Sequence, residues 1–418
     1  MDLSAYAGSS RLDDAPGPLT AAVDVAVERA RTVGAANSHH LNSAGSALPT
    51  AAVVDAVVAH LRYEERVGGY EASAARDADI EAVYAAAARV VGAAVEEIAL
   101  VDSATTGLRV IIDAMRLGPS ARLLVSRSTY VSHALHLLSI AAGVGTELVI
   151  VPNGQDGALD PAQLEELLTV GDGHDDIVCV AHVPTSSGLV EPVAAIGALT
   201  REYGARYVVD ATQSVGQLPV EVDEIGCDAL VTTGRKFLRA PRGTGFAYVR
   251  RSLLDSLSPV APDVRGAVWR GEREWDLAGT ARRFETWESS VAARLGLGVA
   301  LEELLARGVE ATAGHLVAAA TALRAGLAAI DGVIIQDPAA CASGIVTFTV
   351  DGVTAGDVSR RLAESNVRTV SVPSSHGQWD LGSRGVPAVV RASVHVYNDA
   401  SDAQALLDAV AVIAGARG

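Results

Sequence analysis

Lysine is almost absent from this sequence of 418 residues. Lys236 is the only one, and every other residue among the 33 lysines and arginines is an arginine. Either residue can supply an exposed positive charge, but arginine stays protonated in proteins and cannot act as a neutral amine. A lysine that survives in such a background indicates a position that needs a primary amine, for example to form a Schiff base. The alternative is a chance lysine on the surface.

Cysteine and aromatic residues are also scarce. The three cysteines lie far apart among apolar or small residues: Cys179, Cys227 and Cys341. This spacing offers no metal-binding motif and no disulfide framework, so we expect free thiols in a reducing cytoplasm. The pair His39-His40 has no further ligand at a suitable spacing, and we predict no metal site. Aromatic residues make up 4% of a chain that is 49% hydrophobic, so the core must consist mainly of Ala, Val and Leu.

Runs of basic residues and uninterrupted apolar segments are missing too. The net charge of −17 argues against nucleic acid or an anionic membrane as a partner. The N-terminus lacks the charged and apolar regions of a signal peptide, and residues 313–330 contain Arg or turn residues too often to span a bilayer. The length suits two domains with a large core. We therefore expect a globular, cytoplasmic protein.

The sequence around Lys236 indicates a cofactor site. Residues 229–233 predict a buried strand just before the lysine, and residues 206–212 predict another that contains Asp210. A strand that leads to Asp, followed 26 residues later by a Lys, suits pyridoxal phosphate (PLP). The Lys would form a Schiff base with the cofactor aldehyde. The Asp would pair with the protonated pyridine nitrogen.

A regular alternation of strands and helices extends over residues 78–250. Helices are predicted near 79–91, 106–116, 131–142, 161–169 and 194–203, and the strands are 98–103, 122–126, 147–152, 177–183, 206–212, 229–233 and 245–250. Apolar strands alternating with helices are typical of an α/β fold with a mostly parallel sheet covered on both faces. Ligands of such sheets bind beyond the carboxyl ends of the strands. Thr105 and Thr106, which open a helix there, predict a phosphate cradle, with a plain helix N-cap as the alternative.

Two motifs carry a resemblance to a known family. Asp210-x-x-Gln213 followed by Thr233-x-Arg235-Lys236 resembles the class V aminotransferase group of fold-type I PLP enzymes. The resemblance extends over residues 42–398. It implies a large PLP-binding domain (46–288) with a seven-stranded sheet and a smaller C-terminal α+β domain (289–418), with residues 1–45 packing against the small domain. It also implies a homodimer with shared active sites.

The resemblance assigns roles to individual residues. Tyr130 would stack on the cofactor ring, and Thr185 stands where the family commonly has Asn. The expected cofactor-binding residues are Thr105, Thr106, Tyr130, Thr185, Asp210, Gln213, Thr233, Arg235 and Lys236, of which Tyr130, Asp210 and Lys236 are expected to be catalytic. Arg391 would grip the carboxylate of an amino acid substrate. The other expected substrate contacts are Asn42, Ser43, Tyr70 and Trp287.

The absence of a cysteine nucleophile narrows the range of reactions that we expect for this protein. Cysteine desulfurases carry a Cys in the loop before the substrate-binding Arg, and residues 373–388 contain none. The chain further resembles hercynylcysteine sulfoxide lyases and the PLP enzymes of lincosamide pathways that act on S-glycosyl cysteine conjugates. We expect a C–S β-lyase that cleaves an S-substituted cysteine into thiol, pyruvate and ammonia. The alternatives are decarboxylation-coupled oxidative deamination to an aldehyde, an aminotransferase or epimerase, and a cofactor-binding regulator, which would need a DNA-binding domain that the sequence lacks.

Overall fold

The computed structural model describes residues 22–170 and 175–416. Its largest element is a seven-stranded sheet in the order β2-β8-β7-β6-β5-β3-β4. All neighbours from β7 to β4 are parallel, and β8 runs antiparallel to both β7 and β2. The strands are β2 (Ile98–Val101), β3 (Arg122–Val125), β4 (Glu147–Ile150), β5 (Asp176–Ala181), β6 (Arg206–Asp210), β7 (Ala229–Thr233) and β8 (Gly245–Val249). The predicted mostly parallel, seven-stranded sheet is confirmed.

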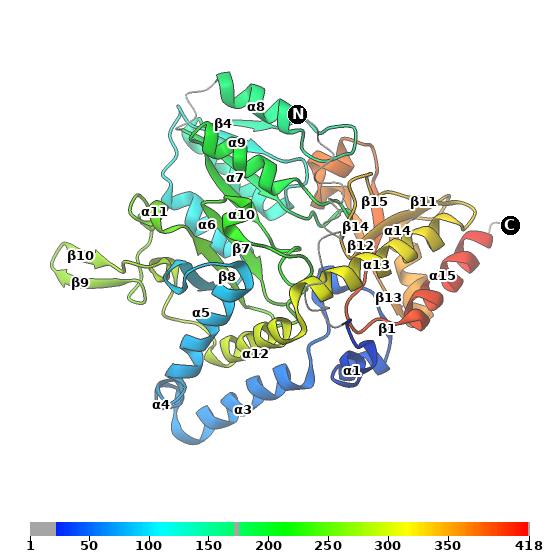
Figure 1. Ribbon diagram of the computed structural model, residues 1–418, viewed down its shortest axis with the longest axis horizontal. Coiled ribbons are helices and arrows are strands. Elements are labelled where there is room, and N and C mark those ends of the chain that lie inside the picture. Colours follow the sequence, from blue (N-terminus) through cyan, green and yellow to red (C-terminus); the bar gives the residue numbers. More distant parts are fainter. Residues whose placement is uncertain (1–21, 171–174, 417–418) are drawn as a thin grey trace, which may run out of the picture.

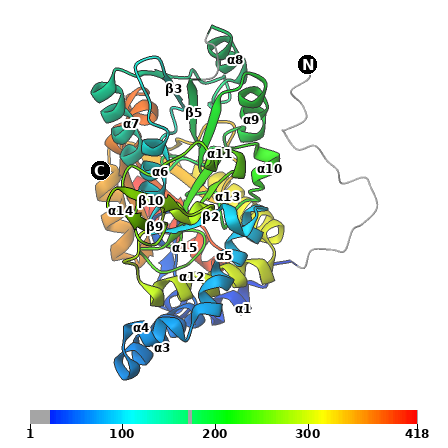
Figure 2. The ribbon, with the colours of Figure 1, turned by 90° about the vertical axis from the view of Figure 1, so that its left-hand side faces the viewer.

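Helices cover both faces of this sheet (Figures 1 and 2). One face packs against α5 (Asp77–Val91), α8 (Pro161–Val170), α9 (Val193–Glu202), α10 (Val222–Ile225) and α12 (Val291–Arg307). The other face packs against α6 (Ala104–Ala114), α7 (Val131–Val144) and α11 (Arg251–Leu254). Strands buried on both faces have no polar side to offer to water, which explains their continuous Val, Leu and Ile runs.

A second sheet of four antiparallel strands forms the C-terminal part of the chain. Its order is β11 (Val333–Ile335), β12 (Ile345–Val350), β15 (Ala388–Ser393) and β14 (Val370–Pro373). Helices α13 (Val309–Ala328), α14 (Ala355–Glu364) and α15 (Ala400–Gly415) share an apolar core with it. Strand β15 ends at Ser393, and beyond it Asn398 folds back, where its Oδ1 accepts the backbone N–H of His395 at 2.8 Å.

The N-terminal segment pairs with the C-terminal part of the chain in a separate two-stranded sheet. After α1 (Val25–Ala30) and η2 (Val33–Ala36), strand β1 (His39–His40) pairs in parallel with β13 (Val367–Arg368). Arg29 forms an ion pair of 2.7 Å with Asp402. The chain then enters the main body through α2 (Ser43–Ser46). The first part of the predicted segment 1–45 lies outside the described residues, which begin at residue 22.

Two features project from the main body, and the first of them, a hairpin, was not predicted from the sequence. A hairpin of β9 (Ala267–Gly271) and β10 (Glu274–Leu277) extends away from the body, as Figure 1 shows. Helix α3 (Ala51–Val67) meets α4 (Gly69–Ala74) at Gly68, whose φ of +98° favours glycine. The stretch 43–67 is long and apolar enough to cross a membrane by length and composition alone, but α3 packs on α12. The remaining short elements are η3 (Val95–Glu97), η4 (Ala281–Phe284), η5 (Ser374–His376) and η6 (Gln378–Gly382).

Candidate active site

Lys236 lies at the carboxyl end of the large sheet. Strand β7 ends at Thr233, and the turn that follows buries the lysine, whose residue is 7% exposed. Its Nζ lies 6.0 Å from the centre of the Tyr130 ring. Lys236 is one of the residues that line a cavity, which we call the lysine cavity. The lining consists of Ser128, Tyr130, Ala181, Val183, Pro184, Thr185, Asp210, Thr212, Gln213 and Lys236. Five residues named from the sequence therefore come together here: Tyr130, Thr185, Asp210, Gln213 and Lys236.

The surroundings of Lys236 favour a neutral amine. Burial and the nearby charges of Arg235 and Arg391 lower the pKa of Lys236 to about 7, and Asp210 only partly opposes them. A charged ammonium is poorly solvated inside a protein and is repelled by neighbouring cations. The site therefore holds a nucleophilic and basic lysine near neutral pH.

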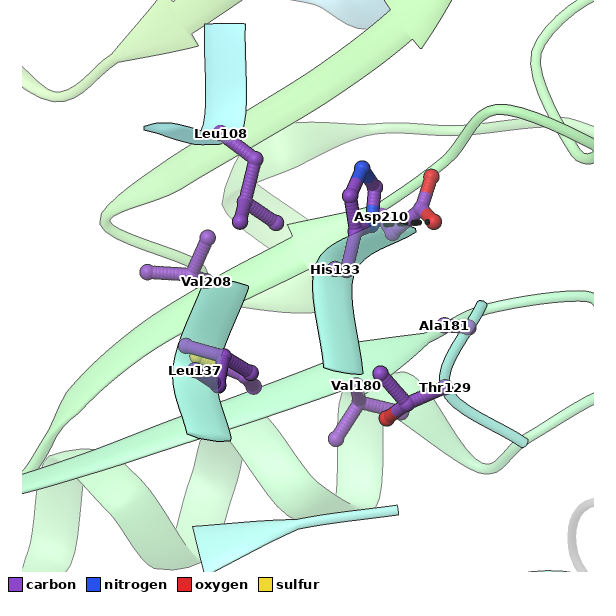
Figure 3. A pocket seen from close by; sticks show the side chains of 9 residues that line it. Leu108, Thr129, His133, Leu137, Val180, Ala181, Val208 and Asp210 are labelled. Atoms are coloured by element: carbon purple, nitrogen blue, oxygen red, sulfur yellow. Dashed lines mark ion pairs between the residues drawn. The ribbon is translucent and has the colours of Figure 1, made fainter. Parts of the chain in front are cut away.

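Asp210 is held ionised by two hydrogen bonds, one of them from His133, which was not among the expected site residues. The Nδ1 of His133 lies 2.9 Å from Oδ2 of Asp210, and the backbone N–H of Thr212 donates to Oδ1 at 2.9 Å. Burial alone would raise the pKa of Asp210, but the charge and hydrogen bond of His133 and the hydrogen bond from the backbone N–H of Thr212 lower it to about 2. Figure 3 shows the pair. The signal in the sequence was the position of His133, three residues after Tyr130 in the first turn of α7.

Arg391, on strand β15 of the smaller sheet, contacts Thr185, which lines the lysine cavity. It is 4% exposed at the end of β15, and its Nη1 donates to Oγ1 and to the carbonyl of Thr185 at 2.6 and 3.0 Å. Its Nη2 donates to Oδ1 of Asn42 at 3.4 Å, while Nε has no partner within the described residues. Burial and the charge of Arg235 lower the pKa of Arg391 to about 10. A guanidinium surrounded by neutral acceptors and a second cation suits an anionic ligand.

Gln213 and Thr212 present unused polar atoms to the lysine cavity. The amide nitrogen of Gln213 donates to the carbonyl of Ala44 at 3.1 Å. Its Oε1 and the Oγ1 of Thr212 are buried and without a hydrogen-bond partner in the part of the chain that the structure describes. Buried polar atoms are normally paired, so these two indicate a ligand with its own hydrogen-bonding groups.

The residues expected at the phosphate lie around the first turn of α6 and the lysine turn. The backbone N–H of Thr106 donates to the Ser103 hydroxyl at 3.1 Å, so Ser103 caps the helix, while Thr105 is half-buried. The hydroxyl of Thr233 donates to the carbonyl of Thr244 at 3.2 Å. The Arg235 guanidinium contacts the carbonyl of Gly45. Since a helix N-terminus and an arginine both favour anions, this side of the site suits a phosphate.

None of the five residues expected to contact substrate lines the lysine cavity of the single chain. Arg391 contacts the lining residue Thr185 and also Asn42, and the other three lie as follows. Ser43 is buried, and its hydroxyl lies 3.1 Å from the Tyr397 hydroxyl. Tyr70 on α4 is 77% exposed. Trp287 is 52% exposed, and its backbone N–H donates to Asp263 at 2.8 Å.

Comparison with known proteins identifies the family. The sequence profile described as "Aminotransferase class-V" matches residues 39–406. The chain belongs to the class-V aminotransferase family. Its relatives in this family include a probable cysteine desulfurase of Methanothermobacter thermautotrophicus, 26% identical over 330 residues that cover 78% of this chain and 81% of the relative. A probable hercynylcysteine sulfoxide lyase of Mycobacterium tuberculosis is 29% identical over 387 residues, covering 90% and 92%.

Solved structures of the class-V family share the fold. The apo cysteine desulfurase of Thermococcus onnurineus superposes with a TM-score of 0.85 over 93% of this chain and 97% of that chain, at 21% sequence identity. At this identity the likeness establishes the fold alone. It agrees with the predicted fold-type I architecture of a large sheet domain and a smaller α+β domain.

The lysine cavity fits the cofactor of the class-V family, PLP. Lys236 supplies the amine for the aldehyde, and Asp210 supplies the carboxylate for the ring nitrogen. Tyr130 supplies an aromatic ring, and the unpaired atoms of Gln213 and Thr212 suit the polar groups of the ring. Among the described residues that line the cavity, Asp210 is the one carboxylate, while Lys236, Arg235 and Arg391 bring positive charge to it. This excess of positive charge matches a phosphate together with a substrate carboxylate. The chain is therefore a PLP-dependent enzyme.

Proposed function

We propose that this enzyme is a C–S β-lyase that cleaves an S-substituted L-cysteine into a thiol, pyruvate and ammonia. The observation that carries the proposal is that the buried Lys236 lies close to the buried Arg391, which contacts the cavity-lining Thr185, while the loop of residues 373–388 offers no thiol. The lysine is a base for the α-proton, and the arginine is a partner for the α-carboxylate.

Arg391 and Asn42 would fix the substrate carboxylate, which leaves the Cα–H bond to be turned toward Lys236. Bound PLP supplies an aldehyde carbon for the substrate amine and a ring that accepts the electron pair released at Cα. Lys236 would remove the α-proton as general base. The Cβ–S bond then breaks, its electron pair leaves on sulfur, and the thiolate takes up a proton. The remaining 2-aminoacrylate reacts with water to give pyruvate and ammonia.

The loop between β14 and β15 supports a lyase over a persulfide-forming desulfurase. It is filled by η5 and η6, and Asp380 in it accepts a hydrogen bond of 3.0 Å from the Ser186 hydroxyl. It contains no cysteine. Cys341 lies elsewhere, in an isolated bridge with Leu189, and burial raises the pKa of its thiol. A thiol with a raised pKa is a poor nucleophile.

We also propose that two copies of the chain assemble and that each lends Tyr70 or Trp287 to the other's site. On α3, the exposed residues Val54, Val58 and Leu61 follow a spacing of four and three and form one apolar stripe. An exposed stripe beside an exposed Tyr70 favours burial against another protein surface. We propose a cytoplasmic location, and the net charge of −17 argues against nucleic acid or an anionic membrane as a partner.

The proposal is tested by supplying purified, PLP-loaded enzyme with S-alkyl cysteines of increasing bulk. Thiol and pyruvate in equal amounts, absent with Lys236→Ala, are expected. L-Alanine, which lacks a leaving group, and L-cysteine, which would release sulfide, are the matched controls. Carbon dioxide with oxygen uptake and an intact thioether would assign decarboxylation-coupled oxidative deamination instead. Transfer of the amino group to a keto acid would assign an aminotransferase.

A further inference from the structure

His133 contacts Asp210 but takes no part in the bond changes of the proposed reaction. His133 is 2% exposed and lies in the first turn of α7, where its backbone N–H donates to the carbonyl of Tyr130 at 2.9 Å. Its ring meets the Tyr130 ring edge-on, with 5.9 Å between the ring centres and 89° between the planes. The same turn of α7 therefore places Tyr130 beside Lys236 and His133 beside Asp210.

The contact between His133 and Asp210 has a defined polarity. An ionised carboxylate only accepts hydrogen bonds, so the Nδ1 of His133, 2.9 Å from Oδ2, carries the proton and donates. The other ring nitrogen, Nε2, is buried without a hydrogen-bond partner among the described residues. A buried imidazole that leaves one nitrogen unpaired gains little for folding, because the unpaired group costs free energy. This arrangement favours a function for the contact with Asp210.

The other side of His133 is apolar. A second cavity of about 10 Å³ shares Asp210 and Ala181 with the lysine cavity, and Figure 3 shows the imidazole between the Asp210 carboxylate and an apolar group of Leu108, Leu137 and Val208. Cys179, which also lines it, stays neutral because burial raises its pKa to about 12. Farther along α7, His136 pairs with Asp113 of α6 at 3.1 Å. The carboxylate that faces His133 is thus Asp210 itself.

We propose that His133 is a positioning residue that fixes the rotamer and the charge of Asp210 for the cofactor's ring nitrogen. With Nδ1 of His133 on Oδ2 and the Thr212 N–H on Oδ1, the carboxylate cannot rotate without losing a hydrogen bond. A carboxylate that stays ionised keeps the ring nitrogen protonated, which is the state that draws electrons from Cα. The inference rests on PLP as cofactor and not on the identity of the substrate.

Two substitutions at one position separate positioning from packing. In His133→Asn the amide nitrogen lies near the place of Nδ1 and can still donate to Asp210. In His133→Gln the amide nitrogen lies near the place of Nε2 and cannot. His136→Asn is the control, since it makes the same chemical change on the same helix at a histidine that pairs with Asp113.

The measurements are the dissociation constant of PLP from the apoenzyme and the pH titration of the absorption of the bound cofactor, both without substrate. We expect His133→Gln to weaken PLP binding by about tenfold or more and to move the pH midpoint by at least half a unit. His133→Asn should retain most of the affinity, and His136→Asn should match the unaltered enzyme.

Two outcomes would overturn the inference. One is a His133→Gln enzyme with unchanged affinity and pH midpoint. The other is an equal loss of affinity in both His133 variants together with an equal fall in the melting temperature of the apoenzyme, since this would indicate packing alone. Neither readout depends on C–S cleavage, so a failed lyase assay leaves this test intact.

Discussion

The charged residues near Lys236 set the pH range in which its amine can react as a nucleophile. Its folded pKa of about 7 lies below the ordinary value of 10.5, because burial, Arg235 and Arg391 disfavour the ammonium form. The neutral amine is therefore the major form above about pH 7, and its fraction falls tenfold for each pH unit below. An exposed lysine would reach this state only above pH 10.

We therefore predict that the rate at which PLP attaches to the apoenzyme rises with pH and levels off slightly above pH 7. Stopped-flow absorbance of the bound cofactor at several pH values measures it. In Arg235→Met the midpoint should move upward, because one of the two cations that lower the pKa of Lys236 is gone. A midpoint above pH 9 in the unaltered enzyme would show that the amine is not perturbed.

Arg391 is the second residue whose chemistry can be tested alone. In Arg391→Lys the positive charge stays, but the planar pair of donors to a carboxylate is lost. We predict a rise in KM for the amino acid substrate of about 10- to 100-fold, with a smaller change in kcat, since binding energy shared by ground and transition states is removed. Steady-state kinetics check this. Arg360→Lys, at an exposed ion pair on α14, should leave both constants unchanged.

At the scale of elements, the start of α6 has two separable functions. Ser103 caps the helix through the N–H of Thr106, whereas no hydrogen bond within the described residues occupies the Thr105 hydroxyl. We predict that Ser103→Ala destabilises the apoenzyme by about 1 kcal/mol, the usual worth of an N-cap.

Thr105→Ala should leave the stability of the apoenzyme nearly unchanged and weaken PLP binding by about tenfold, because one hydrogen bond to phosphate is lost. Chemical denaturation and cofactor titration measure the two effects. If Thr105→Ala bound PLP as tightly as the unaltered protein, Thr105 would have no role in binding phosphate, and the start of α6 would serve only as a capped helix end.

At the scale of the whole molecule, two elements carry large apolar side chains that stay exposed in the single chain. The stripe of Val54, Val58 and Leu61 is exposed on α3, and the hairpin of β9 and β10 projects with Trp269 and Trp275 uncovered. Large exposed apolar side chains that gather on one element usually mark an interface.

We predict that Val58→Glu lowers the mass in solution from twice the chain mass to the 42.9 kDa of one chain, with loss of activity from the incomplete site. Light scattering coupled to gel filtration measures the mass. Val412→Glu makes the same change at an exposed valine on α15 and should have no effect. A Val58→Glu protein of unchanged mass and activity would place the interface elsewhere or remove it.

The residues alone predicted the dependence on PLP and the class of fold. A lone lysine among arginines is a chemical signal that needs no coordinates, and the alternation of apolar strands and helices follows from local periodicity. Both can be seen within short windows, because they depend on residue type and spacing. Lys236, Asp210, Gln213 and Arg391 were named on these grounds together with the family resemblance.

Only the tertiary structure decided what surrounds these residues. The contact of His133 with Asp210 joins α7 to β6, and that of Arg391 with Asn42 joins residues 349 positions apart. Periodicity within one segment carries no information on such pairs. The hairpin at 267–277 escaped prediction because both of its strands are largely exposed and lack the apolar pattern of a buried strand. Tyr70 and Trp287 lie outside the site of the single chain, where both side chains are exposed.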